Sequence, residues 1–192
     1  MKNATTRTLH AYWDRLRAGR AAPERGDIDP GAIRTLLGDV FLLEMDGQAR
    51  HTVRLAGTRI CTLLGHEWKG RPFDGPFPDG DRREIHKLLD GVCTAAAPVV
   101  AGVTGETADG RQIDLELLIL PLRHRGRTHA RLLGSLSCEN WPYWAGQTPL
   151  SRLRLVSFRH LTGERETAAV APVPAIPRPA LGRLRLLPGG RA

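Results

Sequence analysis

The stretch PVVAGVTGETADGRQIDLELLILPL, residues 98–122, carries the clearest structural signal in the chain. At its centre, Asp109-Gly110 is a dipeptide that tolerates the positive φ angles of a tight hairpin turn. After the turn, every second residue is apolar, which is the pattern of a strand with one buried face. That face consists of Ile113, Leu115, Leu117 and Ile119. We therefore predict a β-hairpin with strands over residues 98–107 and 112–122.

Two further hairpins flank this one. Residues 40–45 are apolar, Asp46-Gly47 supplies a turn, and residues 51–55 alternate as a half-buried strand does. A basic turn at residues 124–127 precedes a third apolar run over 130–138. Residues 151–158 alternate arginine with leucine, and they either add a final strand or dock as a short helix.

Helical patterns occupy the remaining segments. Residues 9–17 form an amphipathic helix whose apolar stripe contains Tyr12 and Trp13. Asp29-Pro30 opens a short helix that ends at Gly38, and residues 57–65 form another. Asp81-x-x-Glu84 is a capping box that opens a longer helix. The sequence therefore predicts an α+β fold, a five-stranded antiparallel sheet with helices on one face, preceded by the amphipathic helix.

The charge of the chain is unevenly distributed. The 192 residues contain 28 Lys+Arg and 20 Asp+Glu, a net charge of +8, and half of that excess lies in residues 168–192. That proline-rich segment holds four arginines, no acid and no aromatic residue, so we expect a disordered tail. We predict an N-terminal helix and linker over 1–25, a folded domain over 26–160 and a flexible tail over 161–192. A uniformly basic nucleic-acid-binding domain is disfavoured.

Several classes of protein are excluded by what the sequence lacks. Its three cysteines, Cys61, Cys93 and Cys138, are odd in number and widely spaced, which argues against a disulfide scaffold or zinc cluster and suits a reducing cytoplasm. Residues 1–8 are polar and lack the apolar core expected of a signal peptide, and no apolar stretch approaches the ~20 residues that span a bilayer. No hydrolase, phosphate-loop or zinc-protease motif occurs. We predict a cytoplasmic protein that is not an enzyme, with no catalytic or metal-binding residues.

The runs RLAGTRIC, residues 54–61, and LGHEWKGRPF, residues 64–73, resemble a PAS-type domain, most closely the stand-alone PAS subfamily common in alphaproteobacteria. Further matches extend the resemblance over about residues 8–160. It implies the five-stranded PAS fold, in agreement with the predicted strands, and a regulatory role in which such domains sense small ligands or contact proteins. Members of the subfamily typically have no attached kinase or cyclase.

The resemblance also implies a ligand pocket between the sheet and the connecting helices. Its expected lining is Phe41, Leu55, Ile60, Leu64, Trp68, Leu115 and Leu117. The alternative is that these residues simply fill a packed core. His66 occupies a position where some PAS domains bind haem, but a surface role fits its Gly-His-Glu turn better. Cys61 lacks the sequence context of flavin adduct chemistry, so the cofactor stays unknown.

The predicted function is a sensory or regulatory protein that binds a small ligand, a protein partner in signal transduction, or both. The N-terminal helix, with Tyr12 and Trp13, offers a surface for homodimer formation. The alternative is a nucleic-acid-associated regulator that acts through the arginine-rich tail and the basic hairpin at residues 123–131.

Overall fold

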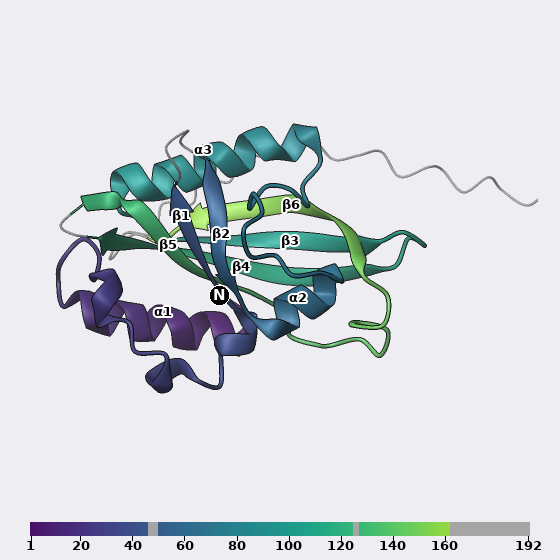
Figure 1. Ribbon diagram of the computed structural model, residues 1–192, viewed down its shortest axis with the longest axis horizontal. Coiled ribbons are helices and arrows are strands. Elements are labelled where there is room, and N and C mark those ends of the chain that lie inside the picture. Colours follow the sequence, from purple (N-terminus) through teal and green to yellow (C-terminus); the bar gives the residue numbers. More distant parts are fainter. Residues whose placement is uncertain (46–49, 125–126, 162–192) are drawn as a thin grey trace, which may run out of the picture.

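The computed structural model describes residues 1–45, 50–124 and 127–161, with side chains throughout except at 127–130. Its centre is a six-stranded antiparallel sheet with the strand order β2-β1-β5-β4-β3-β6 (Figure 1). The strands are β1 (Val40–Met45), β2 (His51–Ala56), β3 (Val99–Thr107), β4 (Gln112–His124), β5 (Arg127–Ser137) and β6 (Leu150–His160). Strands β2 and β6 form the two edges of the sheet.

Helices cover both faces of this sheet. Figure 1 shows α1 (Ala4–Arg17) and α3 (Asp79–Ala95) on opposite sides of it. The short helix α2 (Thr58–Leu64) packs into the same buried cluster as α3. The sheet therefore separates two apolar clusters, one under α2 and α3 and the other under α1.

The central hairpin is confirmed. Strands β3 and β4 pair in register around Asp109-Gly110, with Val103 opposite Leu115, and Gly110 has the positive φ of 85° that the turn requires. The predicted turns at residues 46–47 and 125–126 lie outside the described residues. Residues 150–160, for which the sequence allowed a strand or a short helix, form a strand that pairs with β3. This strand is the sixth of the sheet, one more than the five predicted.

The apolar stripe of α1 is buried against the chain's own sheet. Trp13 is 2% exposed and donates a hydrogen bond from its indole Nε1 to the Pro121 carbonyl at 2.8 Å. Tyr12 is 6% exposed, and its hydroxyl accepts a hydrogen bond from the Asp29 amide at 2.8 Å. The chain's own sheet therefore covers these two aromatic side chains, and homodimer formation through the N-terminal helix stays a prediction. The predicted boundary at residue 25 stays a prediction.

Two helix starts differ from the sequence prediction. Residues 30–38 form two short 3-10 turns over 31–33 and 37–39, because the Asp29 carboxylate accepts from the Gly31 amide and closes a local turn. Helix α3 starts at Asp79, two residues before the predicted capping box. The Asp81 carboxylate accepts a hydrogen bond from the Leu155 amide of β6 at 2.9 Å, so a tertiary contact replaces the cap. The predicted disordered tail lies outside the described residues.

Candidate functional site

Six of the seven predicted pocket residues meet in one buried cluster between the sheet and helices α2 and α3. Each is at most 4% exposed, and the six are Phe41, Ile60, Leu64, Trp68, Leu115 and Leu117. Aromatic rings occupy the centre of this cluster. Trp68 stacks on Phe73 at 5.1 Å between ring centroids, and Phe41 lies 6.1 Å from Trp68 in an edge-on arrangement. The six side chains pack on one another and on neighbouring rings as a core does; a ligand role for them stays a prediction.

Leu55 does not belong to this cluster. It is 48% exposed, and the reason is a β-bulge in the pairing of β1 with β2. Leu43 pairs with Val53 while Leu42 pairs with Leu55, so Arg54 is the extra residue on β2. The extra residue reverses the face on which the following side chain lies, which turns Leu55 away from the buried face that Val53 occupies. The expectation that Leu55 lines an interior pocket is wrong.

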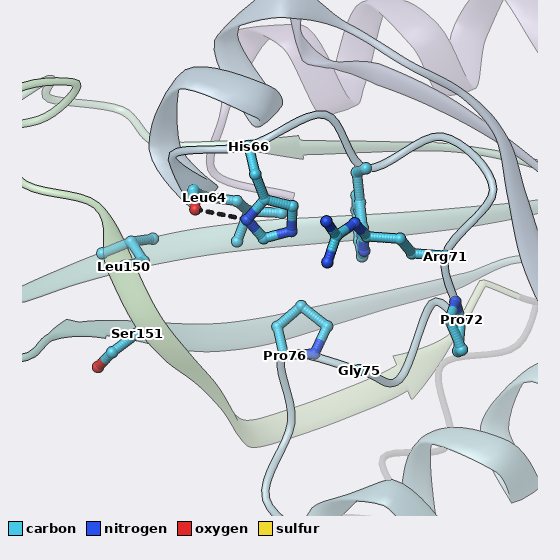
Figure 2. A pocket seen from close by; sticks show the side chains of 9 residues that line it. Leu64, His66, Arg71, Pro72, Gly75, Pro76, Leu150 and Ser151 are labelled. Carbon is cyan, nitrogen blue, oxygen red and sulfur yellow. Dashed lines mark hydrogen bonds between the residues drawn. The ribbon is translucent and has the colours of Figure 1, made fainter.

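A cavity of about 270 Å³ opens at the border of the aromatic cluster (Figure 2). Its walls come from the end of α2, from the connecting segment 65–78 that leads to α3, and from the beginning of β6. The residues that line it are Leu64, His66, Trp68, Arg71, Pro72, Gly75, Pro76, Leu150 and Ser151. Two predicted pocket residues, Leu64 and Trp68, are among them.

Backbone hydrogen bonds hold the connecting segment in place. The Gly70 amide donates to the Val53 carbonyl at 2.7 Å and the Phe73 amide donates to the His51 carbonyl at 2.9 Å, both on β2. At the other end, the Leu153 amide of β6 donates to the Pro76 carbonyl at 2.9 Å. The segment therefore connects the two edge strands of the sheet, and the cavity is built on a fixed frame.

Two nitrogen-rich side chains face each other at the mouth of the cavity. Figure 2 shows the imidazole of His66 and the guanidinium of Arg71 turned toward one another. The His66 Nδ1 lies 2.9 Å from the Leu64 carbonyl. Because a carbonyl only accepts hydrogen bonds, Nδ1 carries the proton, and Nε2 of the neutral ring keeps its lone pair.

Arg71 lacks a partner of opposite charge. Among the described residues no side chain forms a hydrogen bond or ion pair with its guanidinium, and none of the residues lining the cavity is acidic. The acidic residue nearest in sequence, Asp74, is engaged by His86, whose Nε2 lies 2.9 Å from its carboxylate. Arg71 is not among the residues predicted from the sequence, because a single arginine in a loop carries no periodic signal.

Trp68 contributes an unsatisfied polar atom to this region. Its side chain is 1% exposed, and its indole Nε1 has no hydrogen-bond acceptor among the described residues. A buried donor without an acceptor costs about 1–3 kcal/mol, so native proteins keep few of them. Trp68 therefore joins the cavity wall to the aromatic cluster and keeps its indole N–H buried.

The chemistry expected of a catalytic centre or metal centre is not found in the described part of the chain. No three side chains of the metal-binding types gather there. The one buried thiol, Cys93, lies 3.7 Å from the His51 Nε2, and burial followed by the Asp90 charge raises its pKa to about 11. A thiol with that pKa stays protonated at neutral pH and is a poor nucleophile.

None of the described helices is long and apolar enough to cross a bilayer.

An antiparallel sheet with the order β2-β1-β5-β4-β3-β6, with α2, the connecting segment and α3 packed on one face, defines an α+β domain. A family model described as "PAS domain" matches residues 1–137, well over half of the chain. The chain belongs to the PAS domain family, and it is a sensory signalling domain. The match includes α1, which lies before the predicted domain start at residue 26.

The chain is similar to several solved structures at low sequence identity. The PAS domain of an HTR-like protein from Haloarcula marismortui is 20% identical, with 56% of this chain and 89% of that chain covered and a TM-score of 0.42. The LOV protein of Rhodobacter sphaeroides is 14% identical, with 55% and 61% covered and a TM-score of 0.44. A PAS domain from Colwellia psychrerythraea is 16% identical, with 57% and 97% covered and a TM-score of 0.42. No curated protein sequence matches the chain.

Proposed function

We propose that this chain is a non-enzymatic sensory regulator in the bacterial cytoplasm that transmits its signal by binding a protein partner. The observation that supports the proposal is the exposed second half of β6. Val156 is 51% exposed and Phe158 is 39% exposed, on a strand that forms an edge of the sheet. Exposed apolar side chains on an edge strand are typical of a surface that another chain covers.

Among the described residues, contacts from outside the sheet cover only the first half of β6. The Leu153 amide donates to Pro76 and the Leu155 amide donates to Asp81, both outside the sheet. No strand of the described residues pairs with the outer edge of β6. The second half therefore offers the backbone groups and apolar side chains that strand addition uses.

The charge around this surface indicates the chemistry of the partner. Arg154 and Arg159 are exposed on either side of Val156, and neither forms an ion pair with a described side chain. Arg152, further back on β6, is already paired with Glu106 at 2.7 Å. A partner that places apolar side chains on Val156 and Phe158 and carboxylates around them complements this surface.

A photo-crosslinking experiment in the native host tests the proposal. The crosslinking amino acid p-benzoylphenylalanine replaces Val156 or Phe158 in full-length protein, and it replaces Leu55 as the matched control. Leu55 is also an exposed apolar residue, but it lies on β2 at the opposite edge of the sheet. We expect one discrete crosslinked partner from positions 156 and 158 and none from 55. Equal products from all three positions, or none from β6, would contradict the proposal.

Two other parts of the predicted function stay predictions. They are the binding of a small ligand in the interior and the alternative role as a nucleic-acid-associated regulator. The six buried candidates for an interior pocket pack tightly together, so we place the partner first and the interior ligand second. The nucleic-acid alternative depends on residues 168–192, outside the described residues, and on the hairpin at 123–131. No observation favours it.

A further inference from the structure

We propose that the cavity between the connecting segment and β6 binds a small organic carboxylate, with the carboxylate on the Arg71 guanidinium and an apolar body against Leu64, Pro76 and Leu150. The inference does not depend on the partner-binding function proposed above. It rests on the size of the cavity, on the chemistry of its walls and on an arginine that no described acidic group neutralises.

The size of the cavity selects small ligands. Its volume of about 270 Å³ lies just below the range of roughly 300–1,000 Å³ that is common for ligand pockets. Five of its nine lining residues have apolar or aromatic side chains: Leu64, Trp68, Pro72, Pro76 and Leu150. Such walls favour a compact apolar or aromatic body, and they exclude an extended polar molecule such as a nucleotide.

The charge of the cavity selects an anion. Arg71 supplies a permanent positive charge, and no acidic residue lines the cavity. The planar guanidinium offers two parallel N–H donors, whose spacing matches the two oxygens of a carboxylate. A neutral ligand of the same shape does not pair with both donors. The site should therefore bind the carboxylate more tightly than its neutral analogue.

His66 lies beside Arg71 at this site. Its imidazole is turned toward the guanidinium of Arg71 (Figure 2), and its Nδ1 is engaged by the Leu64 carbonyl. That hydrogen bond fixes the ring plane and leaves Nε2 as an acceptor without a partner among the described residues. Because a carboxylate also only accepts hydrogen bonds, Nε2 does not bind it, and the carboxylate is assigned to the Arg71 guanidinium alone.

The frame of the site is formed before any ligand arrives. The connecting segment is bonded to Val53 and His51 on β2 and to Leu153 on β6. A preformed site loses little conformational entropy when a ligand binds. Since Arg71 follows Gly70 and precedes Pro72, both inside this bonded stretch, its backbone is held where the cavity needs it.

The test uses benzoate as the probe and benzamide as its neutral analogue, both titrated into the full-length protein by isothermal calorimetry. We expect saturable binding of benzoate, and binding of benzamide that is at least about tenfold weaker, since a charge-assisted hydrogen bond is lost. Arg71→Gln should weaken benzoate binding by about 10- to 100-fold for the same reason. Arg83→Gln, an exposed arginine on α3 that does not line the cavity, is the matched control and should bind as the parent protein does.

A spectroscopic measurement localises the binding. The indole N–H signal of Trp68, assigned with a Trp68→Phe variant, should shift with the same saturation as the calorimetric titration, because Trp68 lines the cavity. The indole signal of Trp13, which is buried on the other face of the sheet, should not move. Melting curves of the Arg71 and Arg83 variants confirm that both are folded.

Each other outcome overturns the proposal. If benzoate does not bind at millimolar concentration, or binds Arg71→Gln as tightly as the parent protein, there is no carboxylate site at Arg71. If benzamide binds as well as benzoate, the cavity takes neutral molecules and the ligand class is wrong. If inorganic phosphate binds and displaces benzoate from Trp68 at lower concentration, the site selects small inorganic anions rather than an organic carboxylate.

Discussion

The Arg59 guanidinium donates two hydrogen bonds to the Asp39 carboxylate, from Nε at 2.7 Å and from Nη2 at 2.6 Å. The pair joins α2 to the turn before β1. The carboxylate is buried, with 9% of the Asp39 side chain exposed, and the hydrogen bond to it raises the pKa of Arg59. Beside the pair, Gly57 packs so closely on the chain that an added Cβ would lie 2.1 Å from the Leu37 carbonyl oxygen.

Removing Arg59 should destabilise the fold because it leaves a buried carboxylate without its donors. We expect Arg59→Gln to lower the free energy of unfolding by about 1–3 kcal/mol, measured by urea denaturation. Arg54→Gln is the control, since Arg54 is exposed and its pair with the half-buried Glu44 should contribute about 0–1 kcal/mol. In the double variant Asp39→Asn/Arg59→Gln the loss should be smaller than the sum of the single losses. Additive losses would show that the two groups do not interact.

The sequence predicts the strands well where side-chain alternation is strong. Ile113, Leu115, Leu117 and Ile119 all lie on the face of β4 that packs in the cluster under α2 and α3, because alternation in a strand translates directly into faces of a sheet. The other face of β4 is also buried in its second half, where Leu118, Leu120 and Leu122 pack under α1. The same logic fails at Leu55, because a single extra residue in β2 changes the face, and no local pattern marks a bulge.

Local sequence patterns could not predict the cavity, for a different reason. Its walls combine Leu64 and the connecting segment 65–78 with Leu150 and Ser151, which lie more than seventy residues later in the chain. These two parts of the chain come together only because β6 pairs with β3. From the sequence, residues 151–158 are predicted either as a strand or as a short helix. The resemblance to PAS domains pointed to the connecting segment, so Leu64 and Trp68 were named while Arg71 was not.

Glu116 should make the docking of α1 depend on pH. Burial works to raise the pKa of this carboxyl, but the backbone N–H groups of Lys2 and Asn3, at 2.8 Å and 3.1 Å, lower it below the ordinary 4.5. Because its pKa is lower in the folded chain, the carboxylate contributes stability above pH 4.5 and loses it as the pH falls through the folded-state pKa.

The comparison of Glu116→Gln with the parent protein measures this contribution. We expect the variant to be less stable at pH 7, and the difference to shrink as the pH falls below 4.5, because a protonated Glu116 is as neutral as glutamine. Urea denaturation at a series of pH values provides the measurement. Glu84→Gln, on the exposed surface of α3 with Lys87 as partner, is the control and should show no such convergence. A constant difference across the pH range would contradict the role of Glu116.

Cys93 should be the least reactive thiol of the folded protein. Burial, then the Asp90 charge, raises its pKa from 9.0 to about 11, so its thiolate fraction at pH 8 falls by about 100-fold. We expect iodoacetamide to modify Cys61, which is only partly buried, well before Cys93, with peptide mass spectrometry as the readout. In urea the two rates should become similar. Rapid modification of Cys93 without urea would mean that α3 opens away from the sheet.

Asp81 should protect one particular amide in β6. Its carboxylate accepts the Leu155 amide at 2.9 Å, at the point where the pairing of β6 with β3 shifts between Gly102 and Val103. We expect Asp81→Ala to accelerate hydrogen exchange at Leu155 and to leave the exchange of Leu153 unchanged, because the Leu153 amide is held by the Pro76 carbonyl. Asp81→Asn keeps an oxygen acceptor and should retain most of the protection. If all three proteins exchange Leu155 at the same rate, the contact between α3 and β6 does not hold in solution, and the covered half of β6 extends no further than Leu153.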